Sequence, residues 1–433
     1  MVCSSWLKVV AGVTLLGSIA EVARAQAFND FDLAPHSYYS NERADRMSLL
    51  LARVEAGDVD LGTERQLPLL ERLLEELEIP VSSQILLFSK TSLQRKLITP
   101  SNPRAMYFND DTHLAWMPGG KMEIISFDSE SGGRFFIEES PFREPEPIVF
   151  DSPKSCFGCH GGSATNYLPG PLARSNFTSE TGGRLGSVAV HIRMSHEVAF
   201  EDRWGGYFVT GAPASLAHLG NSFAQRQDRT VYLDRESHRE MNSLDGYFDP
   251  AKFPATGSHI VNLLVFDHQI EAHNRLIEAR YRHRQVEYET NKFGRAISKT
   301  RVDTERFFDR LVDYLLFTEE VPLTGHSIER NPAFEEAFRS RRKTGPDGRS
   351  LRDFDLENHI FANRLSYMIQ TPAFTDAPLA MRERVYSRLR ETLVERDSGR
   401  HAHVGRIERE RILSILMATH PDFLLPSDRV ASR

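Results

Sequence analysis

Residues 104–138 read R-A-M-Y-F-N-D-D-T-H-L-A-W-M-P-G-G-K-M-E-I-I-S-F-D-S-E-S-G-G-R-F-F-I-E. Four runs rich in β-branched and aromatic residues lie within this stretch, at 104–109, 112–117, 121–127 and 133–138. Asn-Asp-Asp, Pro-Gly-Gly and Ser-Gly-Gly separate them, and these residues favour tight turns. The pattern therefore predicts antiparallel strands joined by hairpins, with Asp110 and Asp111 in a turn rather than in a cation site.

Further elements are expected on both sides of these strands. Residues 83–89 predict another strand, and 186–194 and 204–211 are also strand-like. Apolar residues at helical spacing predict helices, which are expected at 46–56, 67–78, 259–281, 305–317, 356–368, 380–395 and 405–419. The fold class is therefore α+β, in which N-terminal helices and antiparallel strands at 26–255 pack on a helical C-terminal part at 256–433.

The stretch K-S-C-F-G-C-H-G-G-S at 154–163 carries the chemistry. C-x-x-C-H is the attachment signature of c-type haem. Two thiols at this spacing reach the two vinyl groups on one porphyrin edge, and the adjacent histidine then lies under the iron. We expect Cys156 and Cys159 to bind haem c covalently and His160 to ligate its iron.

Two other uses of this motif are possible in principle. A zinc site needs additional cysteine or histidine ligands at suitable spacing, and the only other cysteine, Cys3, lies near the N-terminus. A redox-active dithiol is typical of a C-x-x-C at the start of a helix in a βαβ unit, whereas this motif lies between Pro-rich and Gly-rich loops. The haem interpretation is the preferred one.

The L-P-G-P segment at 168–171 resembles the loop that, in c-type cytochromes, brings a backbone carbonyl to the other ring nitrogen of the haem-ligating histidine. An ordinary turn is the alternative. The second axial position of the iron is either open or filled by a distant residue, for which we consider His268, His196, Met194 and His218. His268 shares one face of the predicted helix at 259–281 with apolar residues, and His196 follows a strand close in sequence to the motif.

The N-terminus predicts export. A single lysine, an apolar run at 9–20 and Ala-Arg-Ala at 23–25 have the order of a secretory signal peptide, which we place at 1–25. The apolar run is too short to span a membrane as a helix, so no membrane span is expected after cleavage. The net charge of −7 argues against nucleic acid as the partner. A soluble protein of the periplasm, or otherwise exported, is expected.

From Ser89 onward the chain resembles an uncharacterised family of exported bacterial cytochrome c-like proteins with a single C-x-x-C-H motif. The segments that carry the resemblance are R-A-M-Y-F-N-D-D, C-F-G-C-H-G, R-W-G-G-Y-F-V-T-G, H-L-G-N, D-H-Q-I-E-A-H-N, R-S-L-R-D-F-D-L and E-R-V-Y-S-R-L. The resemblance implies haem binding and electron transfer with an unidentified redox partner protein. The alternative is a haem-dependent, peroxidase-like oxidoreductase or a haem-based sensor with an open iron site, because the chain is longer than a haem carrier needs.

Overall fold

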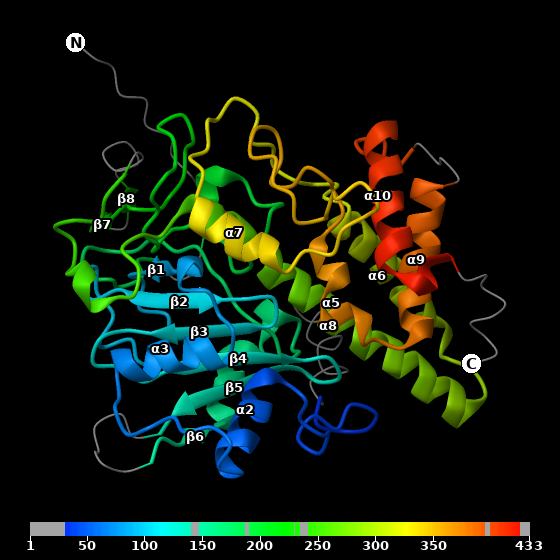
Figure 1. Ribbon diagram of the computed structural model, residues 1–433, viewed down its shortest axis with the longest axis horizontal. Coiled ribbons are helices and arrows are strands. Elements are labelled where there is room, and N and C mark those ends of the chain that lie inside the picture. Colours follow the sequence, from blue (N-terminus) through cyan, green and yellow to red (C-terminus); the bar gives the residue numbers. More distant parts are fainter. Residues whose placement is uncertain are drawn as a thin grey trace.

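The alternating stretch at 104–138 forms the centre of a six-stranded antiparallel sheet (Figure 1). The computed structural model describes residues 31–139, 147–186, 190–228, 230–233, 241–394 and 399–424. The strands follow one another in chain order: β1 (Ile85–Leu87), β2 (Arg104–Phe108), β3 (Thr112–Trp116), β4 (Glu123–Asp128), β5 (Gly132–Glu138) and β6 (Phe150–Asp151). The five strands predicted at 83–138 are thus confirmed, and so is the α+β class.

The sheet has two faces because side chains alternate along each strand. On one face Tyr107, Leu114 and Trp116 pack on the leucines of two N-terminal helices, α2 (Arg46–Glu55) and α3 (Leu67–Glu76). Both helices match their predicted positions. On the opposite face, side chains of neighbouring strands lie next to one another. Met106 on β2 pairs with Ala115 on β3, and Ala115 pairs with Glu123 on β4. This second face is turned toward the cysteine motif.

The described α-helices that follow the sheet lie mainly in the C-terminal half of the chain. They are α4 (Phe157–His160), α5 (Ile260–Phe293), α6 (Ser298–Leu315), α7 (Pro332–Ser340), α8 (Pro372–Thr375), α9 (Leu379–Leu393) and α10 (Arg406–Thr419). Figure 1 shows α5 extending past the ends of the strands, and α6, α9 and α10 lie together beside this part of α5. One apolar core cluster joins residues from β1 and β2 to residues of α5 to α10. The proposed boundary between 26–255 and 256–433 stays a prediction.

Two predicted elements are wrong. Residues 356–368 do not form an α-helix: Leu356 has a φ of +61°, and the Ile360 amide donates to the buried Glu320 carboxylate at 2.9 Å. Tertiary hydrogen bonds here replace helical ones. Residues 204–211 form no regular strand. Trp204 and Gly206 have positive φ angles, and only Tyr207 pairs with the outer edge of β1 as an isolated bridge.

The structure also contains elements that the pattern missed. They include α7, the short elements α4, α8 and β6, and a two-stranded hairpin of β7 (Ala224–Gln227) and β8 (Thr230–Leu233). The predicted signal peptide at 1–25 and residues 187–189 of the predicted run at 186–194 lie outside the described residues. None of the helices that the structure describes is long and apolar enough to cross a membrane.

Candidate functional site

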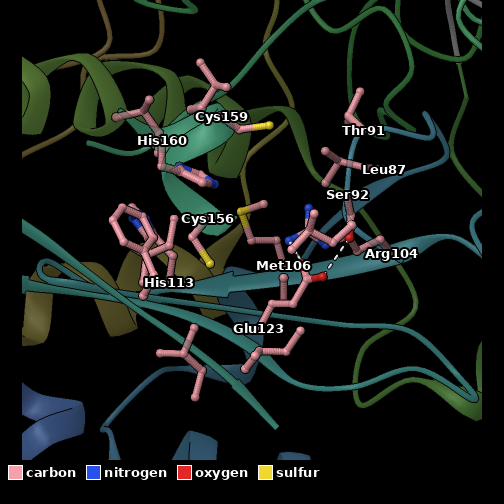
Figure 2. A pocket seen from close by; sticks show the side chains of 18 of the residues that line it. Leu87, Thr91, Ser92, Arg104, Met106, His113, Glu123, Cys156, Cys159 and His160 are labelled. Carbon is pink, nitrogen blue, oxygen red and sulfur yellow. Dashed lines mark hydrogen bonds and ion pairs between the residues drawn. The ribbon is translucent and has the colours of Figure 1, made fainter. Parts of the chain in front are cut away.

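The cysteine motif forms one short helical segment. A 3-10 turn at Lys154–Cys156 continues into α4, so Cys156, Cys159 and His160 stand three and four positions apart on a helical path. Side chains at this spacing share one face. All three residues line the same cavity, between the motif and the sheet (Figure 2). The residues predicted to attach haem are therefore brought together at one site.

The intervening Phe157 anchors the motif. Its ring stacks on Phe31 at a centroid distance of 4.8 Å and meets Tyr38 and Phe135 edge-on, each at 5.3 Å. Such contacts bury apolar area and fix ring orientation. The N-terminal segment and β5 thereby hold α4 in place, while the cysteine thiols remain on the cavity side.

The imidazole of His160 is held in a defined orientation. Its Nδ1 lies 3.0 Å from the carbonyl oxygen of Gly170, and the Gly170 amide donates to the His160 carbonyl at 3.0 Å. A carbonyl oxygen only accepts, so Nδ1 carries the hydrogen and Nε2 keeps its lone pair. The predicted contact between the 168–171 loop and the histidine ring is confirmed.

The same histidine is neutral at physiological pH. Burial lowers the pKa of His160 to about 4, and the opposing effect of the Gly170 carbonyl does not outweigh it. A neutral imidazole with a free Nε2 is the form that binds a metal. A backbone carbonyl on the other nitrogen also raises the basicity of the ligand.

The wall opposite the motif is the second face of the sheet. Ile125, Phe135 and Ile137 contribute apolar surface to it, and α5 adds Phe266 and Ile270. The space within the cavity that no protein atom fills is about 1090 Å³, counting the part open to solvent. An apolar cavity with a few polar groups is typical of a cofactor site.

Charged side chains lie at one side of this cavity. Arg104 forms an ion pair with Glu123, and Arg174 has no ion pair with any described residue. The Nε atoms of both arginines are buried and lack a hydrogen-bond partner among the described residues. Because unpaired buried donors are costly, these two arginines are suited to bind an anionic group of a molecule in the cavity.

The thiols are unpaired in this structure, and Cys159 is exposed. Burial raises the pKa of the Cys156 thiol to about 11, with a smaller contribution from the Glu123 carboxylate. Cys156 is therefore a protonated thiol at neutral pH. Reactive thiols of disulfide oxidoreductases have a lowered pKa instead.

The other predicted iron ligands do not lie at this cavity. Nδ1 of His196 is 2.8 Å from Nδ1 of His268, and Nε2 of His268 is 2.7 Å from Ser366 Oγ. Both rings are fully buried in an aromatic cluster, and neither lines the cavity. Met194 and His218 are buried elsewhere and do not line it either.

The sequence analysis missed several cavity residues with metal-binding atoms, among them a methionine and a histidine. Met106 on β2 and His113 on β3 both line the cavity on the sheet side. Strand alternation placed each of them on one face of its strand. Nothing in the local pattern indicated which face would meet the motif, because that depends on how the sheet packs against α5.

Comparisons with known proteins give no further identification. No protein-family model, no curated protein and no solved structure matches the chain.

Proposed function

We propose that this protein is a c-type cytochrome that binds one haem covalently through Cys156 and Cys159, uses His160 as an iron ligand and transfers electrons. The observation that carries the proposal is the hydrogen bond between His160 Nδ1 and the Gly170 carbonyl oxygen, at 3.0 Å. This bond leaves Nε2 of a neutral imidazole free, and His160 and both cysteines line the same cavity. This is the arrangement that a haem-ligating histidine requires.

The residues around the cavity fit a haem. Its apolar sheet wall suits a porphyrin face, and the two arginines with buried, unpaired Nε atoms suit the carboxylates of haem propionates. Within the described residues, no group of three or more His, Cys, Asp or Glu side chains is arranged to hold a metal ion directly. This supports a role for the cysteines in binding an organic group rather than in a four-ligand zinc site.

When bound, the haem supplies a one-electron couple. The protein contributes the rest. Cys156 and Cys159 would hold the porphyrin edge, His160 would offer its Nε2 lone pair to the iron, and the apolar wall would exclude water. Cys159 is exposed, so the porphyrin edge attached to it would face solvent, where a redox partner protein can exchange electrons.

The high pKa of Cys156 favours haem attachment over a redox dithiol, because a dithiol enzyme needs a thiolate. The N-terminal pattern at 1–25 supports an exported, periplasmic location, where c-type haem attachment takes place. The resemblance to exported cytochrome c-like proteins supports the same function.

Expression in a bacterial host with and without c-type maturation tests the proposal. With maturation, we expect one haem per chain that remains bound on a denaturing gel and in acidified organic solvent. Without maturation, we expect a colourless protein. A protein that contains zinc instead, measured by elemental analysis, or that loses its colour in the solvent would overturn the proposal.

The reduced protein then separates electron transfer from the alternative function of a peroxidase-like enzyme or sensor. A six-coordinate iron that does not bind carbon monoxide supports the electron carrier. An iron that binds carbon monoxide readily supports an open site for a substrate or signal.

A further inference from the structure

The cavity leaves few choices for the second axial ligand of the proposed haem. Apart from the C-x-x-C-H residues, the described side chains that line it and carry atoms able to ligate haem iron are Met106, His113, Glu123 and Tyr207. Burial raises the pKa of the Tyr207 phenol, so this side chain keeps its proton and lacks the anionic oxygen that ligates iron. Glu123 is already engaged. Its carboxylate pairs with Arg104 and also accepts a hydrogen bond from Ser92 Oγ at 2.7 Å. Two candidates therefore remain, both on the sheet wall.

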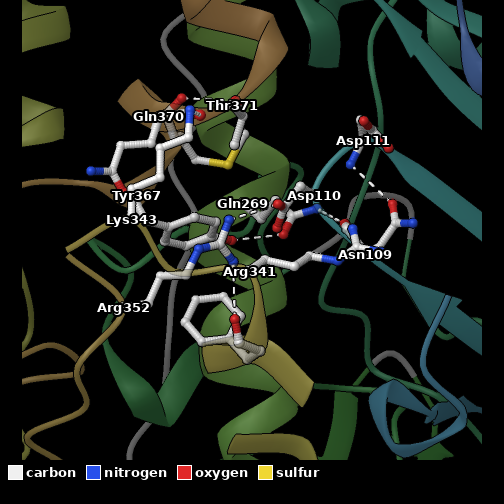
Figure 3. A network of polar contacts seen from close by, with 12 residues as sticks. Asn109, Asp110, Asp111, Gln269, Arg341, Lys343, Arg352, Tyr367, Gln370 and Thr371 are labelled. Carbon is white, nitrogen blue, oxygen red and sulfur yellow. Dashed lines mark hydrogen bonds and ion pairs between the residues drawn. The ribbon is translucent and has the colours of Figure 1, made fainter. Parts of the chain in front are cut away.

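The lone pair of the His113 imidazole accepts a hydrogen bond from another residue. Gln269 Nε2 lies 2.5 Å from the carbonyl oxygen of Asn109, and Gln269 Oε1 lies 2.7 Å from the Tyr367 hydroxyl (Figure 3). The carbonyl of Asn109 only accepts, which fixes the amide nitrogen of Gln269 on that side. The same nitrogen is 3.1 Å from His113 Nε2, so it donates to that atom.

It follows that His113 carries its hydrogen on Nδ1. Burial lowers the pKa of His113 well below its usual value, so the ring is neutral and has only the one lone pair. Nδ1 is itself buried and lacks a partner among the described residues. His113 is thus able to donate a hydrogen bond, and it has no lone pair left for a metal.

Met106 has no such competing contact. Its thioether sulfur is a weak hydrogen-bond acceptor and an established haem ligand. Figure 2 shows this sulfur directed into the same space as the His160 ring. The position is fixed by strand pairing, since Met106 lies opposite Ile85 of β1 and Ala115 of β3.

We propose that Met106 Sδ, together with His160 Nε2, would ligate the iron of the bound haem; this assignment rests on the proposed haem function. His196 and His268 are not needed at the iron, because they bond to each other away from the cavity. Coordination by histidine and methionine gives a higher reduction potential than a histidine pair, and it closes the iron to small molecules. The assignment therefore favours an electron carrier over an enzyme with an open site.

The experiment uses the full chain made with c-type maturation and compares Met106→Leu, Met106→His and Met194→Leu. Leucine replaces methionine with little change in volume. Met194 is a buried methionine away from the cavity, so Met194→Leu is the matched control. Covalent haem content, ferric spin state, carbon monoxide binding and reduction potential are measured for each protein.

For wild type and Met194→Leu we expect low-spin iron that excludes carbon monoxide. Met106→Leu should keep its haem, become high-spin and bind carbon monoxide, and Met106→His should return to low spin with a lower potential. Low-spin iron in Met106→Leu, or high-spin iron in wild type, would overturn the assignment of Met106 while leaving the haem function intact. If His113 were the ligand, His113→Phe rather than Met106→Leu would convert the iron to high spin. A wild type without covalent haem would refute the proposed function itself.

Discussion

The carbonyl oxygen of Gly170 accepts a hydrogen bond from Nδ1 of His160, and the Gly170 amide returns one to the His160 carbonyl oxygen, each at 3.0 Å. This reciprocal pair joins the motif to the 168–171 loop, ten residues further along the chain. It restricts the His160 ring to one orientation and one tautomer. The loop thus holds His160 in the orientation and tautomer that a metal ligand would need.

A substitution in this loop should disturb the orientation of the His160 ring. In Gly170→Ala the added Cβ would collide with Asn274 Oδ1 and approach Thr165 Cβ to 3.3 Å. We expect a loss of roughly 1–3 kcal/mol in unfolding free energy from overpacking and a larger high-spin fraction in the ferric protein. Urea unfolding and electron paramagnetic resonance measure the two effects.

Gly158→Ala is the matched control, because a Cβ there meets nothing within 4 Å. Its unfolding free energy should stay within about 0.5 kcal/mol of wild type, with an unchanged spin state. Equal effects of the two substitutions would show that the loop contact does not orient the ring.

Removal of the thiols should affect stability as well as attachment. The double variant Cys156→Ala and Cys159→Ala should lose the covalent haem and melt roughly 5 °C or more below the matured wild type, because the haem stabilises only the folded state. Calorimetry and a haem stain on a denaturing gel report the two properties. Ser155→Ala, also at the cavity, should retain both. If the double variant melted with the wild type, the haem would be peripheral to the core.

Arg174 should bind a haem carboxylate. Its Nε is buried without a partner among the described residues, so a propionate would satisfy it through a charge-assisted hydrogen bond. Arg174→Gln is expected to lower the stability of the haem-containing protein by roughly 1.5–3 kcal/mol and to leave the haem-free protein unchanged or more stable.

Denaturant titration of both forms checks this expectation, with Arg226→Gln on the exposed strand β7 as the control. A loss of the same size in the haem-free protein would indicate that Arg174 has a structural role only.

The buried histidine pair predicts how stability depends on pH. Burial lowers the pKa of His268 from 6.5 to about 3, with a smaller effect from Arg275, so below pH 6.5 the unfolded chain binds a proton that the folded chain does not. The stabilisation is complete above pH 6.5 and is lost as the pH falls toward 3. Between its folded-state and unfolded-state pKa values, each such histidine changes the unfolding free energy by about 1.4 kcal/mol per pH unit.

His268→Gln should therefore reduce the slope of unfolding free energy between pH 6.5 and 5 by about one such contribution. Urea titrations across this range measure the slope. An unaltered slope in His268→Gln would mean that this ring is protonated in the folded state.

Local sequence patterns were sufficient to predict most of the regular elements and to identify the C-x-x-C-H motif. Period-two runs between turn residues defined the strands at 83–138, since alternation and turn chemistry act over a few residues. The fixed spacing in C-F-G-C-H predicted that Cys156, Cys159 and His160 belong to one site, and the L-P-G-P segment indicated the Gly170 contact. The same kind of local reasoning failed at 356–368. There the Ile360 amide donates its hydrogen bond to the Glu320 carboxylate, 40 residues away in sequence, instead of to a helical carbonyl.

The residues that share the cavity with His160 depend on how distant segments of the chain pack together. A histidine among apolar residues on a helix gives the same sequence pattern whether it ligates a metal or bonds to another core side chain, and His268 bonds to His196 and Ser366. Met106 and His113 reach the cavity only because one face of the sheet packs toward the motif and α5. Which of them has a free lone pair depends on Gln269 and Asn109, whose hydrogen bonds join segments about 160 residues apart. Contacts over such distances arise from packing of the whole chain, which no local pattern specifies.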